Sequence, residues 1–163
     1  MTSTSAIDAL DGRIIRSLDE SPRASVLELA RQLGVARGTI QARLDRLQVR
    51  GIITGFGPDL DLVELGYAVL AFTTLEIAQG RLHDVVEHLR DIPEVLEAHA
   101  TSGTGDLHCR VVARTNSDLQ EVINRILEVQ GIDRSTTVIA LSGQIRYRVM
   151  PLVEAAASHS ASG

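Results

Sequence analysis

The sequence contains few aromatic residues and almost no sulfur. It has no tryptophan, two tyrosines, two phenylalanines and a single cysteine, Cys109. Aliphatic side chains must therefore fill the core, and one cysteine excludes an internal disulfide framework and a cysteine-rich zinc site. No apolar run approaches the roughly 20 residues of a membrane-spanning helix. Because a signal-peptide pattern is also missing, we expect a cytoplasmic protein that does not interact with membranes.

Lysine is absent too, so all 16 basic residues are arginine, a side chain suited to phosphates and guanine edges. The net charge of −5 over 163 residues argues against a nucleic-acid partner. However, residues 1–57 carry a charge of +2, whereas residues 58–163 carry −7. This asymmetry indicates a nucleic-acid-binding domain that is joined to an acidic domain.

Three stretches in the first third of the chain, residues 7–18, 26–33 and 36–50, have apolar residues at helical spacing. Ser25 and Glu28 have the spacing of a capping box at the start of the second stretch. The sequence therefore predicts three consecutive helices, with a short turn before the third.

Residues 52–56 are β-prone and flanked by glycines, so we expect them to form one arm of a hairpin. Three helices followed by a β ribbon are typical of a winged helix-turn-helix domain, which we place at residues 1–57. A small helical bundle with no role in DNA binding would have the same pattern.

The second half of the chain contains an internal repeat with a spacing of 37 residues. The helical stripe of Leu82, Val85, Val86 and Leu89 recurs as Leu119, Val122, Ile123 and Ile126. Strand-like runs flank the two helices, at residues 68–75, 95–101, 107–114 and 136–142. Two tandem βαβ units predict a ferredoxin-like βαββαβ sandwich and an α+β fold overall. Since both helices cover one sheet face, we expect the other face to pack against a second copy.

These patterns predict a linker at residues 58–66 and place the ferredoxin-like domain at residues 67–153. The remaining residues, 154–163, are rich in alanine and serine, and we expect them to be disordered. A run at residues 144–150 has the pattern of a further strand that would extend the contact between copies.

Several segments have the order and spacing of a known protein family: residues 10–18, 28–35, 39–47, 51–53 and 93–99. Together they resemble the Lrp/AsnC family, the feast/famine transcriptional regulators of bacteria and archaea, over residues 7–153. The resemblance implies a DNA-binding domain and a C-terminal domain that oligomerises and senses small molecules, often amino acids. It implies dimers, or tetramers or octamers built from them, a possible amino-acid effector, and neither a cofactor nor catalytic activity.

The third helix of a helix-turn-helix domain enters the major groove of double-stranded DNA with its N-terminal end. We expect base contacts from Arg37, Thr39 and Gln41, since arginine pairs with guanine and glutamine with adenine. Two residues depart from the family pattern: Ala36 is a weak N-cap, and Gly38 lowers helix propensity. Without the resemblance, these side chains would be the ordinary solvated residues of an amphipathic helix.

Four further residues are candidates for contact with the DNA backbone. Arg43 matches a family position that is occupied by arginine, where it meets a phosphate or braces the domain. Arg46 and Arg50 are phosphate candidates, and Ser25 lies at a helix N-terminus, where phosphates bind.

The loop of Gly103, Thr104, Gly105 and Asp106 matches the sensing loop of the family, which usually has the pattern Gly-Asp-aromatic-Asp. One acidic group and one ring are missing here. Small residues would let an amino-acid effector approach the backbone, and Asp106 could pair with its ammonium group. A tight β turn that uses glycine for its backbone angles is an equal alternative.

The sequence offers no metal site, phosphate-binding loop or nucleophile elbow. Only His99 and His108, on neighbouring predicted strands, form a pair among the five histidines. We therefore expect a sequence-specific transcriptional regulator rather than an enzyme. The alternatives are a tetrapyrrole-type decarboxylase of the same layout, and a sensor module that does not bind DNA.

Overall fold

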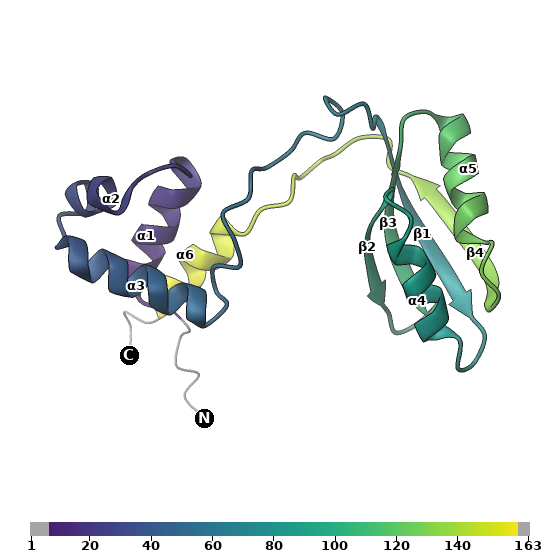
Figure 1. Cartoon of the computed structure of the whole chain (residues 1–163), viewed down its shortest axis with the longest axis horizontal. Coiled ribbons are helices and arrows are strands. Elements are labelled where there is room, and N and C mark those ends of the chain that lie inside the picture. Colours follow the sequence, from purple (N-terminus) through teal and green to yellow (C-terminus); the bar gives the residue numbers. More distant parts are fainter. Residues whose placement is uncertain (1–6, 160–163) are drawn as a thin grey trace. The chain divides into compact units, whose positions relative to one another are not determined.

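A computed structural model of the chain describes residues 7–159 and shows two compact units (Figure 1). The helical unit comprises the residues up to Pro58 together with those from Ile145 onward, and the sheet unit is Asp59–Gln144. The predicted fold class is confirmed: helix-turn-helix helices precede a βαββαβ domain with a four-stranded antiparallel sheet. No helix of the described residues is long and apolar enough to span a membrane.

Three helices, α1 (Ala9–Glu20), α2 (Val26–Leu33) and α3 (Arg37–Val49), form the first part of the helical unit. They pack around a small aliphatic core. Its buried members are Ile14, Leu29, Ala30, Ile40 and Leu44. Each helix contributes to this core from one face, which leaves its opposite face to solvent.

The predicted capping box of α2 is confirmed. The Ser25 hydroxyl accepts from the Glu28 amide at 3.3 Å, and the Glu28 carboxylate accepts from the Ser25 amide at 2.6 Å. Gly34 ends the helix at φ +66°, a left-handed conformation that glycine adopts without strain. Ala36 at the N-cap of α3 makes no side-chain hydrogen bond, as expected from its methyl group.

The predicted hairpin arm at residues 52–56 and the predicted strand at residues 144–150 are both wrong for the described chain. Neither segment is a strand. The amides of Ile52 and Ile53 donate instead to the Leu47 carbonyl, at 2.9 and 3.2 Å, and so extend the end of α3. A strand forms only against a partner strand, and residues 7–159 bring none to either segment.

The expectation that residues 154–163 are disordered is wrong for residues 154–159. They belong to α6 (Met150–His159), which packs on α1, whereas residues 160–163 lie outside the described part. Alanine has the highest helix propensity, and its small side chain permits a close approach to Gly12 of α1. Residues 145–153 therefore fold with the helices and not, as predicted, with the sheet.

The sheet unit has the strand order β2-β3-β1-β4, with all pairs antiparallel. Its strands are β1 (Val69–Ile77), β2 (Val95–Ala100), β3 (Leu107–Ala113) and β4 (Ile132–Ile139). Two helices, α4 (Leu82–Arg90) and α5 (Asn116–Ile126), cover one face (Figure 1). The predicted runs agree closely with β1, β2 and β3. The structure differs at β4, which begins at Ile132, four residues before the predicted run at residues 136–142.

The sheet face opposite the helices carries a mixed set of side chains. The His108 ring stacks on Phe72, with the ring centroids 5.7 Å apart, and its Nδ1 lies 3.2 Å from the Thr74 hydroxyl. His99 is the direct cross-strand neighbour of His108, as predicted. Among the described residues, no group of three or more His, Cys, Asp or Glu side chains is arranged to hold a metal ion.

Candidate nucleic-acid interface

The N-terminal half of α3 presents the three residues predicted for base contacts. Arg37, Thr39 and Gln41 are all exposed. Arg37 and Gln41 are one turn apart and share a face of the helix. Within the described part of the chain, Gln41 donates to Asp45 of the same helix at 2.8 Å, whereas the Arg37 and Thr39 side chains make no hydrogen bond. These side chains are thus available to an external partner.

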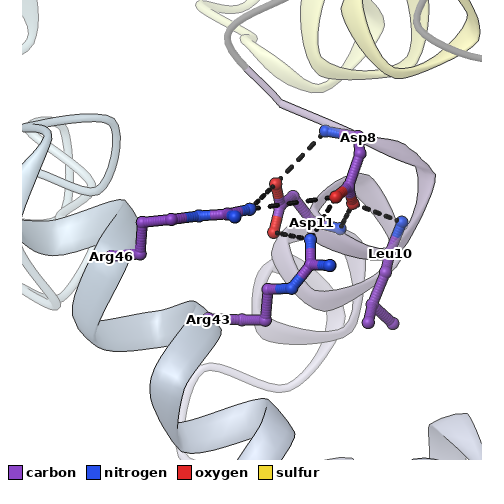
Figure 2. Close-up of polar contacts among 5 residues, drawn as sticks. All are labelled: Asp8, Leu10, Asp11, Arg43 and Arg46. Carbon is purple, nitrogen blue, oxygen red and sulfur yellow. Dashed lines mark hydrogen bonds and ion pairs between the residues drawn. The ribbon is translucent and has the colours of Figure 1, made fainter.

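The C-terminal half of α3 faces α1 through two of the predicted phosphate ligands. The Arg43 guanidinium bonds to Asp8 and lies 3.0 Å from Oδ1 of Asp11 (Figure 2). The Arg46 guanidinium lies 2.6 Å from Oδ2 of Asp11. We call these four residues the aspartate–arginine cluster. Asp11 is fully buried, whereas the Arg43 and Arg46 side chains keep 26% and 44% of their surface exposed.

The two aspartates also hold the start of α1. The Asp8 carboxylate accepts from the amides of Leu10 and Asp11, at 2.9 and 3.0 Å. The Asp11 carboxylate in turn accepts from the Asp8 amide. Burial raises the pKa of the Asp8 carboxyl, but its bonds to Arg43 and to the backbone outweigh burial, so the pKa lies below its usual range. Hydrogen bonds to Asp8 and Asp11 raise the pKa of Arg43. Asp8 and Arg43 therefore stay ionised at neutral pH, and the cluster fixes α3 against α1.

Sequence reasoning missed Asp8 and Asp11 as parts of this site. A signal was present: two acidic residues three positions apart, at the N-cap and in the first turn of α1, match two arginines three positions apart on α3. This spacing places each pair on one helix face. Only the packing of α1 on α3 shows that the two faces meet.

The remaining predicted phosphate ligands lie at the ends of α2 and α3. Arg50 is exposed at the C-cap of α3. Ser25 is exposed at the N-cap of α2, where its oxygen accepts from Glu28 and its hydroxyl hydrogen remains able to donate. Both positions suit contact with an anion.

The division into units sharpens the charge asymmetry of the sequence. Residues 1–58 and 145–163 contain ten arginines and seven acidic residues, a net charge of +3. Residues 59–144 contain six arginines and fourteen acidic residues, a net charge of −8. Of the two, the helical unit is the one with the charge that suits nucleic acid.

The predicted effector loop is tied to the end of β1. Gly103 and Gly105 have φ angles of +110° and +87°, and a Cβ at Gly105 would lie 2.2 Å from Cγ2 of Thr74. The Asp106 carboxylate accepts from the Ile77 amide at 2.6 Å. This geometry has the features of a tight turn, in which Asp106 already has a backbone partner. Thr104 is exposed.

The chain matches two family models, the AsnC-type helix-turn-helix domain at residues 7–48 and the Lrp/AsnC ligand binding domain at residues 70–150. The regulatory protein AsnC of Escherichia coli is 33% identical over 147 residues, which cover 89% of this chain and 97% of AsnC. The solved structure of E. coli AsnC matches with a TM-score of 0.83, covering 89% of this chain and 99% of that one.

Two other solved structures share the fold. An AsnC family transcriptional regulator from Agrobacterium tumefaciens is 26% identical, with a TM-score of 0.78 over 86% of this chain and 94% of that one. A feast or famine regulatory protein from Mycobacterium tuberculosis, complexed with L-methionine, is 24% identical. It matches with a TM-score of 0.77 over 88% of this chain and 99% of that one. The family matches are to transcriptional regulators and not to enzymes, so the decarboxylase alternative is set aside. The chain belongs to the Lrp/AsnC family of DNA-binding transcriptional regulators, with a helix-turn-helix domain followed by a ligand-binding domain.

Proposed function

We propose that the helical unit reads two-fold symmetric DNA sites through the N-terminal end of α3. The observation that carries this proposal is the contrast within α3 itself. Arg37, Thr39 and Gln41 are exposed, while Arg43 and Arg46 bind the carboxylates of α1. A recognition helix needs both a free reading face and a fixed orientation.

In this mechanism, Arg37, Thr39 and Gln41 contact base edges. Arg43 and Arg46 position the helix through Asp8 and Asp11, and the part of each guanidinium that stays exposed faces the DNA backbone. Arg50 and Ser25 bind phosphates at the flanks of the site. Because phosphate contacts release counterions, binding weakens steeply as salt increases.

The sheet unit mediates both the pairing of two chains and the response to the effector. Its open face pairs two chains, which sets the distance between two helical units and hence between the half-sites. Dimers of this kind can assemble further into tetramers or octamers. The partner is genomic DNA, so we propose a cytoplasmic location.

We further propose an amino acid as the effector, bound at the Gly103, Thr104, Gly105 and Asp106 loop. The support is the bound L-methionine of the M. tuberculosis relative and the exposed, glycine-rich loop of this chain. Asp106→Asn tests the pairing with an ammonium group. The amide oxygen can still accept from Ile77, so the turn is kept while the charge is lost. Titration calorimetry with L-methionine and other amino acids should show weaker binding by the variant, and equal binding would refute this role.

Selection of binding sites from fragmented genomic DNA tests the DNA-reading proposal. The wild-type protein should enrich a two-fold symmetric motif at near-physiological salt, and the double variant Arg37→Ala, Gln41→Ala should lose it. Arg90→Ala is the matched control, since it removes an exposed arginine of the sheet unit. Enrichment of the same motif by the double variant would refute the assignment of the base contacts to α3.

A further inference from the structure

The C-terminal segment belongs to the DNA-binding part of the molecule. The Arg16 guanidinium of α1 lies 2.7 Å from the Glu154 carboxylate of α6, and Gly12 faces Ala157 so closely that a Cβ on Gly12 would lie 2.8 Å from it. Residues from Ile145 onward accordingly group with the helices and not with the sheet. The chain thus leaves the helical unit, forms the sheet unit and returns.

The returning segment, residues 145–149, precedes α6 and lies outside any helix or strand. It alternates apolar and basic residues, with arginine at positions 146 and 148. In an extended segment alternate side chains project to the same side. Arg146 and Arg148 would therefore present two guanidinium groups together, and both residues are exposed.

Arg146 and Arg148 also lack a carboxylate partner among the described residues. The arginines of the helical unit that form ion pairs are Arg16, Arg43 and Arg46, each with an acidic residue of the same unit. An ion-paired guanidinium has much of its charge neutralised, whereas a free one is available to an external anion.

We propose that Arg146 and Arg148 contact backbone phosphates of the DNA that α3 reads. This inference rests on the proposed function of α3 and adds a second contact segment to it, from the opposite end of the sequence. Phosphates are the expected ligand because the guanidinium fork matches their oxygens and because α6 anchors the segment to the same unit that carries α3. Contacts of this kind strengthen binding without reading sequence.

The test is the affinity of the full-length double variant Arg146→Ala, Arg148→Ala for a selected site and for an unrelated duplex, across a salt series. Each phosphate contact contributes about 0.9 to the slope of log affinity against log salt. We expect the slope to fall by about 1.8 per bound helical unit. The affinity should fall by the same factor on both duplexes, and the variant Arg146→Lys, Arg148→Lys should restore most of it.

Arg90→Ala serves as the matched control and should leave the slope unchanged. An unchanged slope in the Arg146→Ala, Arg148→Ala variant would overturn the inference, provided that Arg37→Ala still weakens specific binding. A loss of DNA affinity accompanied by a changed oligomeric state in analytical ultracentrifugation would also overturn the inference. That result would assign the segment to a contact between copies of the chain. If Arg37→Ala had no effect either, the proposed role of α3 would fail instead.

Discussion

Arg46 of the recognition helix places its guanidinium 2.6 Å from a carboxylate oxygen of Asp11, a residue of α1 with no solvent exposure. Removal of that carboxylate leaves two cations without their buried partner. We expect Asp11→Ala to lower the free energy of unfolding by about 2–3 kcal/mol, less than for a fully buried pair because both arginines are partly exposed. Urea denaturation measures the change. Asp19→Ala, at an exposed position of the same helix, should change it little. Equal effects of the two variants would contradict the role of the cluster.

Asp8 makes the stability of the helical unit depend on pH. Its pKa is lowered in the folded protein, so the stabilisation is fully present above the unfolded-state pKa of about 4. It is lost as the pH falls through the lower, folded-state pKa. The variant Asp8→Asn should therefore show a weaker loss of stability in acid than the wild type, as followed by thermal unfolding between neutral pH and strongly acidic pH. Parallel curves for the two proteins would refute this linkage.

Gly12 decides whether α6 can lie on α1. At an exposed helix position, Gly→Ala stabilises by about 1 kcal/mol through helix propensity. Here the added Cβ would lie 2.8 Å from that of Ala157, so Gly12→Ala should destabilise the docking of α6 instead. We expect faster proteolysis of the C-terminal segment in this variant. The double variant Gly12→Ala, Ala157→Gly should restore resistance, and a more stable single variant would show that α6 does not pack there.

The turn between β2 and β3 depends on Gly105 more than on Gly103. Both have a positive φ, so an alanine is strained at either position by roughly 1–2 kcal/mol. Only at Gly105 would the new Cβ also collide with Thr74, at 2.2 Å from its Cγ2. Thermal unfolding should show a larger decrease in Tm for Gly105→Ala than for Gly103→Ala. The reverse order would indicate that the loop does not pack on β1.

Cys109 is expected to be chemically inert in the folded protein. Burial raises the pKa of its thiol to about 11, so very little thiolate is present near neutral pH. An alkylating reagent at pH 8 should react slowly with the native protein and rapidly in denaturant. Fast native labelling would contradict the burial of β3 against the helices and would reopen a redox role for this residue.

The sequence alone determined the elements whose pattern is local. The capping box of Ser25 and Glu28 and the stop at Gly34 need no distant partner, because each satisfies backbone groups within a few residues. The 37-residue repeat likewise predicted two βαβ units, since apolar periodicity reports which face of each element is buried.

Tertiary structure decided the features that depend on two distant segments. An alanine-rich tail can be a solvated coil or a helix, and the packing of α6 on α1, at Gly12 and through the Arg16–Glu154 ion pair, stabilises the helix. Arg43 and Arg46 are a second case: the sequence offers them as phosphate candidates, and only the tertiary structure shows that they also bind the carboxylates of Asp8 and Asp11. The segment at residues 52–56 is the opposite case: it has the composition of a strand, but no strand of the described residues lies beside it. Local patterns fix the conformation that a segment prefers, whereas long-range contacts decide which partner each side chain meets and whether the preferred conformation forms.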